Sequence, residues 1–363
     1  MGGIELIAAG IGEELRRRLP GQRETRREGL ALLVATMLSE RGANLMELAA
    51  ALPRSAERID MRCQWIVRVL ATPRIERDAV MAPFAREVLA RAAEAGRVEL
   101  IPDQSKLPDR HRVPMPALRF GERALPLAWR VEEAAGPMGW PHQAPLLDLV
   151  AAWLPEGAAV MVLGDRFHGT AAAISTCAAR GWDYRLRLKG DLRAFAEDVS
   201  AAPASRLAGA QLYLTGVELT AERAPTDIGV ICDPGHDEPW TVAMPGEPTY
   251  LSTLDYARRW GVEPMFSDFE SRGFGLDDTR IRRPDRLARL VLVMALALHC
   301  AVSTGVQDEA ARSSPAEAKP AAKRRKNVAR GRVSWFTRGL RCIARLLQSA
   351  LPLPPLWATP ARN

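Results

Sequence analysis

Three residue types that could act together on a phosphate lie close together in residues 256–270. Tyr256, Arg259 and Glu263 stand at positions i, i+3 and i+7, and Glu270 adds an acid at i+14. On an α-helix, with about 100° per residue, these side chains would share one narrow face. A carboxylate beside a guanidinium and a phenol suits a metal ion and a phosphate. A solvated helix face with ordinary charge pairs explains the same pattern equally well.

Pro264 directly follows Glu263 and constrains the helix that holds this acid. A proline disfavours helical dihedrals in the residue before it, and it lacks a backbone donor. Two arrangements satisfy these constraints. Either the helix begins near Pro264, with the proline in its first turn, or the helix is kinked at Glu263.

Two further acids follow apolar runs that predict strands. The Val-rich run that leads into Asp165 predicts a buried strand with a carboxylate at its carboxyl end. Residues 170–179 then predict a helix, and residues 182–189 alternate like a second strand. An acid at the end of the first strand of such a unit is a usual position for an α/β active site. Asp103 likewise ends a short apolar run, and residues 119–131 predict a hairpin arm that returns beside it.

Taken in order, Asp103, Asp165 and Glu263 resemble the three acids of the DDE transposases of bacterial insertion sequences. Tyr256, Arg259 and Glu263 match the spacing of the motif Tyr-x2-Arg-x3-Glu-x6-Lys of the insertion-sequence-four family.

Two residues depart from that pattern. Glu270 stands at the lysine position and replaces a cation that would contact DNA phosphate, and His168 stands where a small residue is more usual.

The resemblance implies an α/β fold with a ribonuclease-H-like catalytic core, and it implies two divalent ions, Mg²⁺ or Mn²⁺. Such ions take oxygen ligands, and a pair of them activates the attacking oxygen and stabilises the leaving one. Asp103 would bridge the two ions, with Asp165 and Glu263 each completing one. Tyr256 and Arg259 would hold a phosphate near the cut.

The partners implied by the resemblance are double-stranded DNA, at terminal inverted repeats and at a target site, and a second copy of the chain in a homodimeric synaptic complex. It further implies a DNA hairpin intermediate and insertion by the freed 3′ hydroxyl. Two alternatives stay open: a degenerate or repurposed transposase that binds DNA without cutting it, and a ribonuclease-H-like nuclease without strand transfer. A metabolic enzyme has little support, since the sequence holds no Gly-rich phosphate loop.

Composition is compatible with these partners. Fifty Lys and Arg residues against 43 Asp and Glu give a net charge of +7, and 47% hydrophobic residues support a real core. The five dispersed cysteines form no Cys-x-x-Cys pair, which argues against a zinc site and favours a reducing compartment. Residues 290–302 are apolar but too short for a membrane span of about 20 residues. They predict a buried helix against the sheet in a soluble, cytoplasmic protein without a membrane partner, associated with the nucleoid when bound to DNA.

Residues 1–95 predict a helical N-terminal DNA-binding domain. Asn44 is expected to cap one helix, and Ser55 the next. The second of these helices carries Arg62 and Arg68, so the pair predicts a helix-turn-helix, with a generic helical bundle as the alternative.

The rest of the chain divides by composition. Residues 96–302 predict the catalytic core, interrupted at 203–250 by a β-rich insertion in which period-2 alternation runs between Pro and Gly turns. Residues 303–332 predict a flexible linker that carries a basic, DNA-contacting cluster. The cluster consists of Lys323, Arg324, Arg325 and Lys326. Residues 333–363 predict an amphipathic helix over 335–347 and a C-terminal tail.

Overall fold

The computed structural model describes most of the chain. The residues outside the description are 1, 55–57, 108–110, 135, 191, 197–198, 202–210, 221, 233–237, 313–332 and 358–363. The chain forms two compact units: residues 1–80 with 267–363, and residues 81–266. Residues 267–302, which the sequence analysis assigned to the catalytic core, thus cluster with the N-terminal helices. The functional division into domains stays a prediction.

The first unit is helical. Its helices are α1 (Gly3–Arg18), α2 (Glu24–Glu40), α3 (Leu45–Ala51), α4 (Ile59–Ala71), the 3₁₀ helix η2 (Leu276–Asp278), α10 (Pro284–Arg312) and α11 (Trp335–Gln348). As predicted, Asn44 caps α3, because its side chain accepts a hydrogen bond from the Met46 N–H. The N-cap of α4 is Arg58, without a side-chain cap, and Ser55 lies outside the described residues.

Helix α10 forms the core of the helical unit. Residues 290–302 are buried in it, as predicted, and α10 packs within this unit on the helices α2, α4 and α11. Among the described residues, α10 is long and apolar enough to cross a membrane, yet 94% of its most apolar window is buried, as in a core helix. The helix continues to Arg312, so residues 303–312 are helical and do not belong to the linker expected there.

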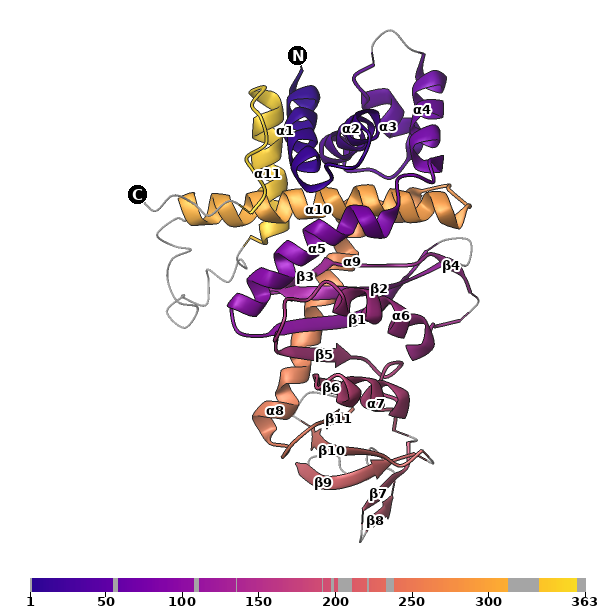
Figure 1. Cartoon of the computed structure of the whole chain (residues 1–363), viewed down its shortest axis with the longest axis vertical. Coiled ribbons are helices and arrows are strands. Elements are labelled where there is room, and N and C mark those ends of the chain that lie inside the picture. Colours follow the sequence, from indigo (N-terminus) through magenta and orange to yellow (C-terminus); the bar gives the residue numbers. More distant parts are fainter. Residues whose placement is uncertain are drawn as a thin grey trace. The chain divides into compact units, whose positions relative to one another are not determined.

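The predicted C-terminal helix is present as α11, which contacts α10 and α1 (Figure 1). Its apolar face is buried, with Phe336, Leu340 and Ile343 at its centre. Gly305 of α10 and Gly339 of α11 lie where the two backbones meet, because a Cβ on either glycine would overlap a carbonyl of the other helix. This close crossing explains why α10 stays helical through a Ser-Thr-Gly segment of modest helix propensity.

The second unit is built on one mixed sheet (Figure 1). Its strands are β1 (Val98–Lys106), β2 (His111–Phe120), β3 (Arg123–Pro126), β4 (Glu132–Glu133), β5 (Val160–Gly164), β6 (Asp183–Arg187), β7 (Ala194–Ala196), β8 (Val199–Ala201), β9 (Leu212–Leu219), β10 (Ala224–Ile231) and β11 (Trp240–Met244). The order is β3-β2-β1-β5-β6-β11-β10-β9-β7-β8, with β4 on β2. Strands β1, β5 and β6 run parallel, and β1, β2 and β3 are antiparallel neighbours.

One strand partner differs from the prediction. The arm over 119–131 was expected beside the Asp103 strand, but β3 pairs with β2, and β2 is the neighbour of β1. Pro114 and Pro116 lie within β2, and prolines in a run normally argue against an interior strand. Because of these prolines, the alternation of side chains does not predict β2 from the sequence.

Strands β9, β10 and β11 lie where the alternation predicted strands, and they are antiparallel. Strand β11 pairs with β6, so they extend the main sheet. The assignment of residues 203–250 as an insertion into a catalytic core stays a prediction.

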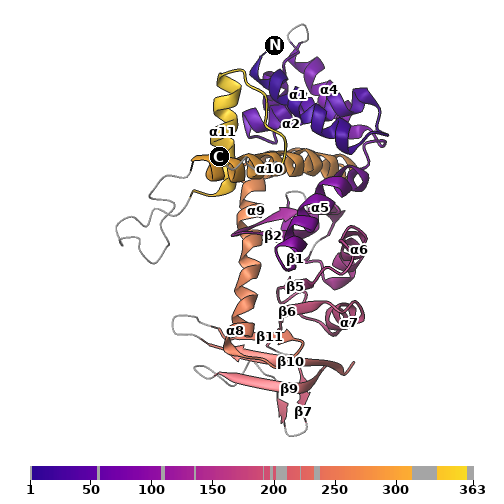
Figure 2. The same ribbon diagram turned by 60° about the vertical axis from the view of Figure 1, so that its left-hand side comes forward.

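Helices cover both faces of the sheet near β1, β5 and β6. Helices α6 (Trp140–Ala151) and α7 (Ala171–Ala179) lie on one face, and α8 (Tyr250–Leu254) and the 3₁₀ helix η1 (Asp255–Gly261) lie on the other (Figure 2). Helices α5 (Arg77–Glu94) and α9 (Val262–Phe269) cross the boundary between the units. Asp103 and Asp165, two acids of the candidate site, lie on the face of the sheet that η1 covers.

Candidate active site

Asp103 lies inside β1 and not at its end, which corrects the expectation from sequence. The strand continues to Lys106 because pairing with β2 continues through Ser105 and Lys106. Asp103 is buried, and its Oδ1 accepts a hydrogen bond from the Gln104 N–H at 2.8 Å. Its backbone carbonyl accepts from Nε2 of the buried Gln143 at 2.6 Å.

Asp165 follows the end of β5, as predicted. Its Oδ1 accepts hydrogen bonds from the Phe167 N–H at 2.9 Å and lies 2.8 Å from Nδ1 of His168. His168 is fully buried, and Gly164 makes room for it, since a Cβ on Gly164 would lie 2.9 Å from the His168 Cβ. The histidine at this unusual position therefore holds Asp165 in place.

Tyr256 and Arg259 lie on the 3₁₀ helix η1, and Glu263 lies on α9. The prediction of a single α-helix over 256–270 is wrong, because residues 255–261 form a 3₁₀ helix and α9 ends at Phe269. A 3₁₀ helix turns about 120° per residue, so a different set of side chains shares one face. Of the two arrangements considered for Pro264, the first holds, because α9 begins at Val262 and the proline sits in its first turn.

Glu270 does not continue that helical face. It follows the end of α9, and its backbone carbonyl accepts hydrogen bonds from the N–H groups of Gly273 and Gly275. Gly275 has a positive φ of 63°, which few side chains tolerate, so the chain turns here instead of extending the helix.

The guanidinium of Arg259 brings the three acids together. Its Nη2 lies 2.7 Å from Asp103 Oδ2 and 4.0 Å from Asp165 Oδ2, and its Nη1 lies 3.7 Å from Glu263 Oε1. Arg259 and Asp103 are nearly buried, whereas the Glu263 side chain is 65% exposed. The two aspartates thus contact the arginine on the side that is shielded from solvent, and Glu263 lies on the side that is exposed to solvent.

Burial and the arginine act on these groups in opposite directions. Burial raises the pKa of Asp103, and the nearby Arg259 offsets part of that rise. Burial also disfavours ionised Asp165, but the hydrogen bond and charge of His168, together with the charge of Arg259 and the Phe167 N–H, outweigh it, so the pKa of Asp165 lies below its ordinary value. The desolvation cost is therefore concentrated on Asp103.

The donor chemistry of this cluster fits a hard divalent cation. Three carboxylates supply oxygen ligands of the kind that Mg²⁺ and Mn²⁺ take. In the described part of the chain, no group of three or more His, Cys, Asp or Glu side chains is arranged closely enough to hold a metal ion. The charge of Arg259 stands between the acids instead. The residue types therefore fit the metal, and a cation there would share the carboxylate oxygens that Arg259 contacts.

Tyr256 is buried and does not lie open to a ligand. Its phenol oxygen accepts a hydrogen bond from Arg187 of β6, and burial raises the pKa of the phenol. Its ring packs edge-on against Trp240 at 5.2 Å between centroids. Sequence reasoning assigned no role to Arg187 or to His168. The alternation in β6, which places Arg185 and Arg187 on one face, was the available signal for Arg187.

The predicted DNA contacts of the helical unit lie in different settings. Arg62 Nη1 donates to the carbonyls of Ala50 and Leu52, so this arginine satisfies the end of α3. Arg68 Nε donates to the Gln64 carbonyl within its own helix. The cluster Lys323, Arg324, Arg325 and Lys326 lies outside the described residues.

A separate arginine-rich pocket of about 630 Å³ lies in the helical unit; its lining includes Arg41, Asp308, Arg338, Arg341 and Arg345. We call it the arginine pocket. Asp308 accepts from Arg338 at 3.0 Å and from Arg345 at 3.2 Å. The pocket lining holds four arginines and one acid, so it has an excess of positive charge that suits phosphate.

Comparison with known families agrees with this chemistry. Residues 141–300 match the model of the transposase DDE domain. The match includes Asp165, Tyr256, Arg259 and Glu263, and it leaves Asp103 outside. It spans less than half of the chain, and it supports a DDE transposase. No curated protein matches the chain significantly.

Proposed function

We propose that this protein is a DNA transposase of a bacterial insertion sequence, of the insertion-sequence-four type, with Asp103, Asp165 and Glu263 as its catalytic acids. The observation that carries the proposal is the convergence of these three carboxylates on one guanidinium, in a chain whose residues 141–300 match a transposase DDE domain. The order β3-β2-β1-β5-β6, antiparallel and then parallel, supports a ribonuclease-H-like core.

Two divalent ions, Mg²⁺ or Mn²⁺, would be held by Asp103, Asp165 and Glu263 and would activate the attacking oxygen and stabilise the leaving 3′ oxygen. Residues of the chain itself hold the acids in position. His168 and the Phe167 N–H fix the orientation of Asp165, and pairing of β1 with β2 fixes Asp103. If Arg259 moves away from the acids, its guanidinium can hold a phosphate with two parallel donors.

The proposed substrates are the terminal inverted repeats and a target site. Two ends must be joined in one event, so a homodimer in a synaptic complex is the proposed assembly. Backbone phosphates would be held by Arg62 and Arg68, by the basic cluster at 323–326 and by the arginine pocket. We place the protein in the bacterial cytoplasm, on the nucleoid when bound.

The test is cleavage of DNA that carries the ends of the element. Purified protein would be incubated with the labelled ends and a target plasmid in Mg²⁺, in Mn²⁺ or in EDTA. Metal-dependent double-strand cuts followed by joined product support the proposal. Cuts without joined product would favour a ribonuclease-H-like nuclease.

Binding without cutting would favour a degenerate or repurposed transposase. One observation motivates that second candidate, namely the position of Arg259 between the acids, where it competes with a metal ion. Titration of the metal-free protein with Mn²⁺, followed by electron paramagnetic resonance, separates the two. An active enzyme takes up Mn²⁺ when the DNA ends are present, and a degenerate copy does not.

A further inference from the structure

We propose that Glu99 is a positioning residue of the active site, which sets the place of η1 along β1 and thereby the places of Arg259 and Glu263. The consequence for catalysis rests on the proposed function. The structural part of the proposal stands on contacts within the second unit alone.

Glu99 and Asp103 lie on the same face of β1, because residues four apart in a strand point the same way. Two consecutive residues of η1 meet them. Arg258 approaches Glu99 with Nε at 2.9 Å and Nη2 at 2.6 Å, in a two-donor arrangement, and Arg259 donates to Asp103 at 2.7 Å. Two ion pairs at separate points of one strand fix the helix along that strand, which a single pair would not do.

Glu99 concentrates several contacts in one buried group. It is 5% exposed, and its carboxylate also meets Arg97 at 3.2 Å and Arg119 at 3.4 Å. Arg119 of β2 additionally donates to the Arg258 backbone carbonyl. Three guanidinium groups therefore surround one carboxylate, and they would repel one another if its charge were lost.

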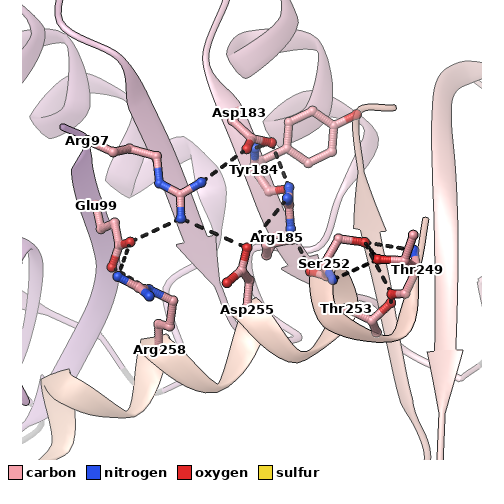
Figure 3. Close-up of polar contacts among 10 residues, drawn as sticks. All are labelled: Arg97, Glu99, Asp183, Tyr184, Arg185, Thr249, Ser252, Thr253, Asp255 and Arg258. Carbon is pink, nitrogen blue, oxygen red and sulfur yellow. Dashed lines mark hydrogen bonds and ion pairs between the residues drawn. The ribbon is translucent and has the colours of Figure 1, made fainter. Parts of the chain in front are cut away.

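The same network holds the start of η1 on β6 (Figure 3). Arg97 lies 3.8 Å from Asp183 and 3.9 Å from Asp255, the first residue of η1. Arg185 bonds to Asp183 at 2.6 Å, lies 3.8 Å from Asp255 and donates to the Ser252 carbonyl at 2.8 Å. The helix is thus anchored at its start by β6 and at its end by β1.

A buried charge network of this kind is a weak source of stability, because desolvation costs about as much as pairing returns. Its geometric effect is larger, since it determines which residue of η1 faces Asp103. The end of η1 is also closely seated, because a Cβ on Gly261 would lie 3.2 Å from the Arg123 carbonyl. Among the described residues, the charged side chains that pair with Glu99 are arginines. Glu99 therefore acts through these arginines and not directly on a substrate.

Trp260 reports the position of η1 directly. Its ring packs edge-on against Trp240 of β11 at 5.2 Å between centroids. Protein labelled with 5-fluorotryptophan gives a fluorine resonance for Trp260, which Trp260→Phe assigns. We expect Glu99→Gln to shift or broaden that resonance and Glu99→Asp, which keeps the charge, to change it less.

The matched control is Glu14→Gln. Glu14 is also a buried glutamate, 7% exposed and paired with Arg17 and Arg18, but it lies in the helical unit. It should leave the Trp260 resonance unchanged. A Trp260 resonance in Glu99→Gln equal to that of the wild type would overturn the proposal. Should Glu99→Gln fail to fold, Arg258→Gln, which removes the partner of Glu99 on η1 at a half-exposed position, decides in the same way.

Cleavage supplies the second measurement. With saturating DNA, the single-turnover rate of Glu99→Gln should fall about 10–100-fold, as for residues that orient an active-site ligand. The Kd for DNA should rise less than in Arg259→Ala, because Arg259 keeps its charge. Glu99→Asp should recover part of the rate. An equal loss in Glu14→Gln would mean a general loss of stability and would refute positioning. If the wild type does not cleave at all, the proposed function fails, and the Trp260 resonance still decides the role of Glu99.

Discussion

Arg259 donates to Asp103 over 2.7 Å, although 156 positions separate them in the sequence. The side chains are equally shielded from solvent, at 12% exposure each. In this structure the guanidinium supplies the positive charge that lies beside the acids. Arg259 is thus both the candidate phosphate ligand and the counter-charge of the three acids.

Glu263→Gln should abolish metal-dependent cleavage. Loss of a direct carboxylate ligand should lower the rate by more than the roughly 100-fold seen for residues that only orient ligands. DNA affinity should stay near the wild-type value, because arginines supply most of the binding. Gel assays of cleavage and fluorescence anisotropy of binding measure the two effects. Wild-type cleavage by this variant would mean that the third acid lies elsewhere.

Arg259→Ala should lower both DNA affinity and its dependence on salt. Loss of one phosphate contact should reduce the slope of log K against log salt by about 1. Arg259→Lys keeps the charge but not the two-donor geometry, so it should restore the slope more than the cleavage rate. Anisotropy titrations over a salt series measure the slope. An unchanged slope in Arg259→Ala would show that this arginine stays with the acids when DNA binds.

The double variant Arg341→Ala/Arg345→Ala tests the arginine pocket. If both side chains contact phosphate, the salt slope should fall by about 2 and affinity should fall at every DNA sequence. The double variant Arg74→Ala/Arg86→Ala removes the same charge from exposed positions that do not line the pocket. Equal losses in the two double variants would show that net charge matters and the pocket does not.

Gly339→Ala should destabilise the helical unit. An added Cβ would overlap the Ala301 carbonyl of α10, so the free energy of unfolding should fall by about 1–3 kcal/mol. Gly12→Ala in α1 is the control, since its Cβ would have no neighbour closer than 3.9 Å, and alanine favours a helix by about 0.5–1 kcal/mol. Urea unfolding measures both. A Gly339→Ala protein as stable as wild type would contradict the close crossing of α10 and α11.

Local pattern was sufficient for several elements. The strand before Asp165, helix α7, strand β6 and the C-terminal helix α11 lie where periodicity and capping residues predicted them. Each of these is set by residues within one or two turns or by alternation along a single strand. The same local signals placed Asp165 at a strand end, whereas for Pro264 they left a first-turn position and a kink as two alternatives.

Contacts between distant segments decided the rest. Pairing with β2 put Asp103 inside β1, and the seating of Gly261 against the Arg123 backbone accompanies a 3₁₀ turn where an α-helix was expected. The sequence by itself determined which acids and which arginine stand in a transposase-like order. The tertiary structure decided that Arg259 lies between those acids and that His168 and Glu99 hold the site. The physical reason is that side-chain periodicity is a short-range property, whereas the meeting of residues 156 positions apart depends on sheet register and helix placement, which no local pattern encodes.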